Sequence, residues 1–219
     1  MAVQQYLMMG RAASGRKIIT GERWVFGNNA YGIGGVGNDT GLSLPLQVGA
    51  LENWQNTEQP GGHVANCCTV KSDGTLWTWG RNNNGTLGLG DTTTRSSPVQ
   101  VGSDTDWLDV CHFSGFMGAI KTDGTFWTWG GGSAGALGHG NTTNYSSPVQ
   151  VGSATDWAHV IAWDANASIV MKTNGALYYS GTGSGFGASN VSTHIQVGSE
   201  TGFVDCIGKA EHLIMWKEA

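Results

Sequence analysis

The chain has 219 residues, a net charge of −5 and charged side chains at only 12% of its positions, whereas 36 residues are glycine and 10 are tryptophan. Glycine this frequent disfavours a helical bundle, because each glycine costs about 1 kcal/mol in a helix interior, and glycine without a three-residue period excludes collagen. The negative charge disfavours nucleic-acid binding and no apolar run approaches the ~20 residues of a membrane span, so we expect neither a nucleic-acid partner nor a membrane.

Residues 1–15 precede the first recognisable pattern and are predicted to form an N-terminal arm, either an attachment segment or a frayed terminus. The first ten residues are too short and too polar for a signal peptide, so export by the general secretion route is not expected. Residues 16–219 are predicted to form one domain of four repeats.

The repeats can be read directly from the sequence. Residues 76–102 return 50 positions later as 126–152, with LWTWG becoming FWTWG and SSPVQVG unchanged. Weaker copies begin at 23–27 (RWVFG) and 177–181 (LYYSG), and the last has lost about five residues from its middle. Degenerate terminal copies are typical of repeat arrays.

Each copy is predicted to contain four short strands. In the second copy a strand ending at Lys71 is followed by Asp73 and Gly74, a pair that strongly favours a β-hairpin. The rest of that copy is predicted as an aromatic strand at 76–79, a glycine-rich loop at 80–90, a turn region at 91–97 and strands at 99–101 and 107–111. Four short strands in about 50 residues describe one blade of a β-propeller.

The tryptophans are predicted to lie between neighbouring blades. Trp77 and Trp79 share one face of their strand because side chains alternate along a strand, and Leu76 lies on the other face. A tryptophan buries roughly 150–250 Å². Without such rings a chain this rich in glycine could hardly offset its backbone entropy.

These motifs resemble the repeats of RCC1-type β-propellers. The resemblance covers about residues 16–219 and is strongest in the two middle copies. The residues that carry it are Trp77 to Val101 with Gly85, Leu87, Gly88, Gly90, Asp91 and Thr92, and Trp127 to Val151 with Gly135, Leu137, Gly138, Gly140, Asn141 and Thr142.

The resemblance implies an all-β propeller with about four blades of short antiparallel strands, and it does not imply one function. The family includes a chromatin-bound exchange factor for a small GTPase, a secreted inhibitor of β-lactamases, and bacterial and phage proteins of unknown role. The family's typical ring has seven blades, whereas this chain has four repeats and lacks a basic tail. The near-identical spacer looks most like repeats from environmental bacteria and their phages.

Closure of the ring is left open by the sequence. Residues 203–219 align without gaps to 107–123, so the chain ends where a hairpin would turn. The missing partner strand is predicted at 23–26, although 17–20 competes for the same place. We expect either a closed or near-closed four-bladed unit, or an open one that another subunit completes.

We expect no catalytic, cofactor-binding or metal-binding residues, and hence no enzyme. The glycine-rich loops lack the Lys-Ser/Thr of a phosphate loop, and no two histidines have zinc-ligand spacing. Gly-x-Ser-x-Gly at 131–135 lacks a following helix, so it is interpreted as a chance match. Cys111 and Cys206 are interpreted as apolar packing residues, and Asp104 and Asp106 as turn caps rather than calcium ligands.

The candidate interaction residues are those that change where the repeat is otherwise constant. Leu42, Arg95 and Tyr145 occupy neighbouring positions of the first three copies and are predicted to lie at loop tips. Arg and Tyr are frequent in interfaces, although sequence drift would produce the same variety.

The leading functional hypothesis is a non-enzymatic structural or attachment module, a capsid decoration or tail-fibre-associated protein located in the virion. Its partners would be other virion or surface proteins, or a second copy of itself. The alternatives are a protein-binding propeller of inhibitor or GTPase-regulator type, a lectin that binds cell-surface glycans through exposed tryptophans, and a location in the bacterial cytoplasm.

Overall fold

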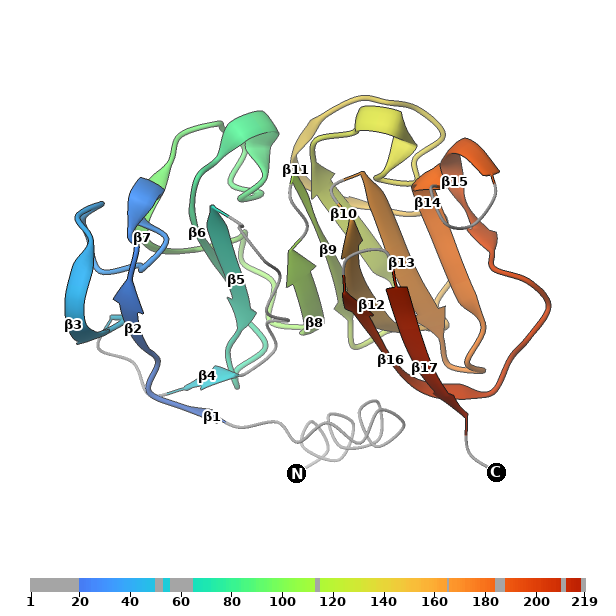
Figure 1. Ribbon diagram of the computed structural model, residues 1–219, viewed down its shortest axis with the longest axis horizontal. Helices are drawn as coiled ribbons and strands as arrows, with labels where there is room; N and C mark the ends of the chain where they lie inside the picture. Colours follow the sequence, from blue (N-terminus) through green and yellow to red (C-terminus); the bar gives the residue numbers. More distant parts are fainter. Residues whose placement is uncertain are drawn as a thin grey trace.

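The computed structural model describes residues 20–49, 53–55, 65–112, 115–164, 166–183, 188–209 and 212–217. Within these residues the chain forms short antiparallel strands and three single-turn 3-10 helices. The sheets follow one another in chain order along an arc, from β2 and β3 at the left of Figure 1 to β12–β15 at the right, with β16 and β17 in front of β12. The predicted all-β, propeller-type fold is confirmed.

Three blades lie between two half-blades. The N-terminal half-blade is β2 (Trp24–Gly27) and β3 (Leu42–Gln47). Blade one is β5 (Asn66–Val70), β6 (Leu76–Gly80) and β7 (Arg95–Gln100), joined through a bridge between Trp54 and Lys71 to β4 (Trp54–Gln55), which also pairs with β1 (Thr20–Gly21). Blade two is β8 (Trp107–His112), β9 (Phe116–Lys121), β10 (Phe126–Gly130) and β11 (Tyr145–Gln150). Blade three is β12 (Trp157–Asp164), β13 (Ala167–Lys172), β14 (Leu177–Gly183) and β15 (Ala188–Gln196), and the C-terminal half-blade is β16 (Phe203–Lys209) and β17 (His212–Lys217).

The predicted Asp-Gly hairpins are present. Gly74 has φ +80°, and a Cβ there would lie 2.1 Å from the carbonyl oxygen of Thr105, so only glycine fits. The Asp73 carboxylate accepts the backbone N–H of Thr75 at 3.0 Å and its hydroxyl at 2.6 Å. The turn therefore fixes the register in which β5 and β6 pair.

Indole rings fill the space between adjacent blades, as predicted. Trp79 and Trp129 are fully buried, and Trp77 and Trp127 are half-buried. The indole of Trp129 donates a hydrogen bond of 2.9 Å from Nε1 to the carbonyl of Thr86 in the preceding blade. Because Trp79 and Trp129 lie inside the protein, these two repeated rings offer no exposed platform on which a glycan could stack, as the lectin hypothesis requires.

One local prediction needs correction. The predicted turn region at 91–97 is shorter, because β7 already begins at Arg95. A register shift between Thr78 and Gly80 lets Gly80 pair with Arg95, so the ladder continues past the irregularity.

The predicted closure between 23–26 and the C-terminal strand is not formed within the chain. Among the described pairings, β2 pairs with β3 and β17 pairs with β16, in separate sheets. The predicted arm at 1–15 and the start of the domain at 16–19 lie outside the described residues. Nowhere in the described part of the chain is there a helix with the length and apolar content needed to cross a bilayer.

Candidate functional site: the loop rim and the groove between blades one and two

The three candidate interaction residues start equivalent strands rather than occupying loop tips. Each pairs across the ladder with a positive-φ glycine that ends the preceding strand, and each is half-buried. The pairs are Leu42 with Gly27, Arg95 with Gly80, and Tyr145 with Gly130. The loop-tip prediction was wrong because pairing resumes at these residues immediately after the register shift.

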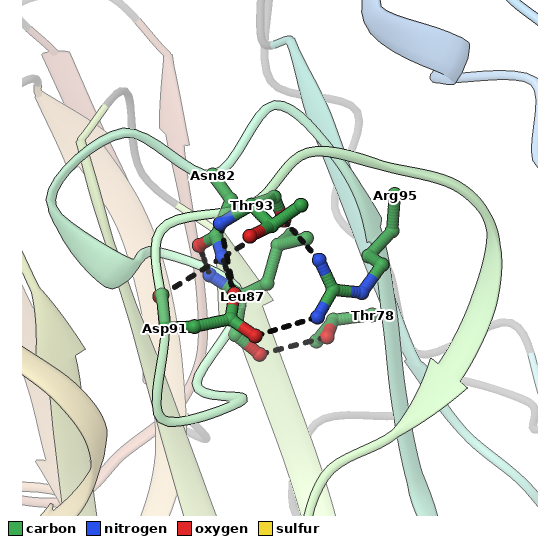
Figure 2. A network of polar contacts seen from close by, with 6 residues as sticks. All are labelled: Thr78, Asn82, Leu87, Asp91, Thr93 and Arg95. Carbon is green, nitrogen blue, oxygen red and sulfur yellow. Dashed lines mark hydrogen bonds and ion pairs between the residues drawn. The ribbon is translucent and has the colours of Figure 1, made fainter.

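Asn82 is the centre of the loop that precedes Arg95 (Figure 2). Its amide nitrogen donates to the carbonyl of Asp91 at 3.0 Å and to that of Thr93 at 3.1 Å, while its side-chain oxygen accepts the N–H of Leu87 at 2.8 Å. The hydroxyl of Thr78 on β6 donates to the carbonyl of Leu87 at 2.7 Å. One fully buried asparagine therefore satisfies the backbone of a loop that has little regular structure.

Arg95 closes the same network from the next strand. Its guanidinium lies 2.6 Å from the Asp91 carboxylate and donates to the carbonyl of Thr93 at 2.7 Å. The N–H of Thr93 and the Arg95 side chain hold the pKa of Asp91 below its ordinary value. Arg95 thus braces its own loop and leaves part of its side chain at the surface.

Tyr145 and Leu42 brace the equivalent loops in other ways. The Tyr145 hydroxyl accepts the Asn141 amide at 3.1 Å, and its ring contacts His139 edge-on at 5.0 Å. Leu42 packs against the first loop so closely that a Cβ on Gly34 would lie 3.1 Å from its Cδ1. The residue that varies between repeats therefore has a structural task in each of them.

A groove of about 440 Å³ lies between blades one and two. The half-buried Trp127 provides aromatic surface inside it above the buried ring of Trp107, and Arg95 and Asp104 provide charges of opposite sign. Leu89, Ser147 and Pro148 also line this groove.

Two of the repeats match a known family. The family model described as "Regulator of chromosome condensation (RCC1) repeat" matches residues 73–114 and 123–162. The Arabidopsis thaliana ultraviolet-B receptor UVR8 is 36% identical over 78 residues, which is 36% of this chain and 17% of the receptor.

Solved structures agree with the sequence matches. Human WBSCR16 superposes with a TM-score of 0.77 at 20% identity, covering 91% of this chain and 54% of that one. Yeast RCC1 with Kap60 bound gives a TM-score of 0.72 at 10% identity, and Prp20p from Saccharomyces cerevisiae gives 0.73 at 11% identity. These two matches also cover 91% of this chain, and 51% and 52% of the other chains.

Residues 73–114 and 123–162 of this chain are RCC1-type repeats. The chain spans about half the length of the solved structures that it matches and a smaller part of the curated relative. The resemblance inferred from the repeated motifs is confirmed.

One recurring lysine is not among the residues singled out from the sequence: it occupies the same position of the hairpin at Lys71, Lys121, Lys172 and Lys217. The ammonium of Lys121 lies 4.8 Å from the ring centre of Trp107 and 5.0 Å from that of Trp127. Its Nζ also lies 2.6 Å from Asp104 and 3.0 Å from Asp106, so these carboxylates hold a lysine and are not turn caps. The signal was available, because the four lysines recur at the repeat offset.

The surroundings of these lysines differ from blade to blade. Burial lowers the pKa of Lys71, and the charge of Asp73 only partly offsets this effect. Burial also acts to lower the pKa of Lys121, but hydrogen bonds to Asp104 and Asp106 outweigh it and raise the pKa above its ordinary value. Each ammonium is held in place by its neighbours, as expected for a structural group.

The described histidines also have structural partners. His159 Nδ1 lies 2.7 Å from the Asp109 carboxylate, joining the inner strands of blades two and three. His194 Nε2 lies 3.0 Å from the Ser168 hydroxyl, and burial, with a smaller effect of His139, lowers the pKa of His194 to about 3. Across the described ranges, no three His, Cys, Asp or Glu side chains form a group that could hold a metal ion.

The remaining motif predictions can be placed in the same way. Ser133 of the Gly-x-Ser-x-Gly match begins the 3-10 turn η3 (Ser133–Gly135), so the strand-turn-α-helix context of a nucleophile is missing there. Cys111 is buried and makes apolar contacts, as predicted. The side chain of Cys206 lies outside the described part of the structure.

Proposed function

We propose that this chain is a non-enzymatic protein-binding module that holds a partner protein at the groove between blades one and two. The observation that carries the proposal is the groove itself, which combines the half-buried ring of Trp127 with the charges of Arg95 and Asp104. Aromatic residues and arginine dominate the energetics of protein interfaces.

The loops beside the groove support this proposal. Asn82 and Arg95 hold the loop of blade one through hydrogen bonds and an ion pair, so a partner would meet a surface that is already ordered. A preorganised surface loses less entropy on binding. Yeast RCC1 is seen bound to Kap60, and its binding to Gsp1p and histones has been described, so protein binding is what we carry over to this chain.

We prefer protein binding to the virion attachment hypothesis because of what supports each of them. The relatives support a protein-binding repeat, whereas a capsid or tail location is supported only by the likeness of the spacer to phage repeats. The absence of catalysis is part of the proposal, and it is supported by the structural pairing of Lys121, His159 and Asp109.

The test uses two matched variants. Ser147→Arg places a large side chain in the groove from an exposed position, and Ser97→Arg makes the same change at the equivalent exposed position of blade one, which does not line the groove. Binding is measured by biolayer interferometry against a purified small GTPase, core histones and a β-lactamase. The proposal predicts saturable binding to one of them that Ser147→Arg weakens at least tenfold and Ser97→Arg leaves unchanged. Equal affinities for the two variants, or no binding to any of the three, would count against it.

A further inference from the structure

The two half-blades together reproduce the strand pairing of one complete blade, with β16 and β17 equivalent to β8 and β9, and β2 and β3 equivalent to β10 and β11. The register of β16 with β17 repeats that of β8 with β9, including the shift, since Phe203 pairs with Lys217 as Trp107 pairs with Lys121. The register of β2 with β3 repeats that of β10 with β11. One half-blade therefore supplies the inner pair of strands and the other supplies the outer pair.

The edges of the half-blades expose large apolar side chains. Trp24 and Phe26 on β2 are 56% and 74% exposed, although the equivalent Trp127 and Trp129 of blade two are half-buried and fully buried. On β17, Met215 and Trp216 are 40% and 45% exposed. Exposed apolar side chains beside an unpaired strand edge favour the addition of another strand.

Among the described residues, no strand occupies the space beside Gly27. Its φ of +109° matches those of Gly80, Gly130 and Gly181, which lie between +97° and +102°. At Gly130 a Cβ would lie 2.7 Å from the Cα of Phe116 on the neighbouring strand, whereas at Gly27 it would meet nothing within 4 Å. The backbone of β2 is thus shaped for a close neighbour on its free edge.

In the part of the chain that the structure describes, Lys217, the repeated lysine on β17, has only one of the two ring partners that Lys121 has. Lys217 lies 5.9 Å from the ring centre of Phe203 and 3.2 Å from Glu200, as Lys121 lies beside Trp107 and Asp104. The second ring that Lys121 contacts is Trp127, and its equivalent in the incomplete blade is the exposed Trp24. The side chain of Lys217 is 52% exposed, whereas that of Lys121 is 10% exposed.

We propose that β17 of one copy pairs with β2 of a second copy, so that two half-blades from different chains make one complete blade. The register follows from β9 and β10 of blade two: Met215 would lie opposite Trp24, and Trp216 opposite Arg23. The pairing brings Trp24 to Lys217 and the backbone of His212 to Gly27.

A second copy fits better than closure within one chain. Figure 1 shows β2 at the left end of the arc and β17 in front of blade three at the right, and in chain order three blades lie between them. The solved structures superpose on nearly all of this chain but use only about half of their own length for it, so the arc has the curvature of a larger ring. When two copies are arranged head to tail around a two-fold axis, the β17 edge of each copy pairs with the β2 edge of the other. No half-blade edge is then left exposed. Because each copy contributes three blades and shares two, the ring has eight.

Cysteine cross-linking tests the pairing and its register. Directly opposite residues in antiparallel strands have the Cα separation of a disulfide. Under mild oxidation, an equimolar mixture of the Trp24→Cys and Met215→Cys proteins should give a disulfide-linked dimer, and the double variant should also run as a covalent dimer on a non-reducing gel. Leu44→Cys mixed with Met215→Cys is the matched control, since Leu44 is 70% exposed on β3 and lies outside the proposed pairing.

The outcomes separate the possible occupants of β2. An internal disulfide in a monomeric double variant would show closure within one chain and overturn the proposal. Sedimentation of the unmodified protein at the mass of one chain, across concentrations that span the micromolar range, would also overturn it, because a strand from another protein would then be required. The groove between blades one and two is not part of these edges, so failure of this proposal leaves the protein-binding function untouched, and the reverse also holds.

Discussion

Replacing Lys121 with methionine tests the interpretation of the repeated lysine as a structural clamp. The substitution keeps an apolar stem between Trp107 and Trp127 and removes the ammonium, which lies within 5.0 Å of both rings. It also removes the ion pairs with Asp104 and Asp106, whose side chains are 52% and 44% exposed and stay hydrated without the lysine.

The magnitude follows from these contacts. Each cation–π contact contributes about 0.5–1 kcal/mol at a partly exposed site, and each ion pair to an exposed carboxylate contributes about 0.2–1 kcal/mol. Release of the ammonium from its nearly buried position offsets part of this sum. We expect the free energy of unfolding to fall by about 1–3 kcal/mol.

The assay is urea unfolding followed by tryptophan fluorescence at constant protein concentration, with Lys71→Met as the matched control. Lys71 has the same two-ring sandwich, at 4.4 Å from Trp54 and 3.8 Å from Trp77, without the short carboxylate contacts found at Lys121. In 1 M salt the cost of Lys121→Met should shrink and that of Lys71→Met should change little. A Lys121→Met protein as stable as the parent, or equal salt dependence for the two variants, would refute the clamp interpretation.

Three further predictions follow from the packing. Trp129→Phe leaves the Thr86 carbonyl without its indole donor inside the protein and should lower the unfolding free energy by about 1–3 kcal/mol, measured by urea unfolding. Gly130→Ala forces a Cβ against the backbone of β9 and should lower the melting temperature strongly, whereas Gly27→Ala carries only the positive-φ strain of about 1–2 kcal/mol within one chain and should act mainly by weakening the pairing of β2 with a second copy; a dimer that Gly27→Ala leaves intact would contradict that pairing. Because burial holds the pKa of His194 at about 3 while the unfolded chain titrates near 6.5, the stability it supports is present above pH 6.5 and lost on acidification, by up to about 1.4 kcal/mol per pH unit; His194→Phe should flatten that slope between pH 6 and 4, and an unchanged slope would assign it to other groups.

The repeated architecture could be predicted because each repeat encodes its blade locally. The Asp-Gly turn at Asp73 and Gly74 specifies a hairpin, and the alternation of Trp77 and Trp79 specifies which face is buried between blades. Both signals act within a few residues, and the 50-residue repeat shows them twice.

The site could not be predicted to the same extent because it depends on contacts between repeats. The groove exists only where blades one and two meet. The position of Arg95 depends on the register shift between Thr78 and Gly80, which the residues around Arg95 do not predict. The hydrogen bond between Asp109 and His159 joins residues 50 positions apart that occupy the same place in successive repeats. A comparison of charged residues at equal repeat positions would have found the lysines and this pair.

Single-particle images of the unmodified protein test the central claim most directly, that the arc is completed by a second copy through β2 and β17. The account predicts a two-fold symmetric ring of eight blades, with a mass twice that of one chain. A separate four-bladed disc, or an open arc with the mass of one chain, would contradict it.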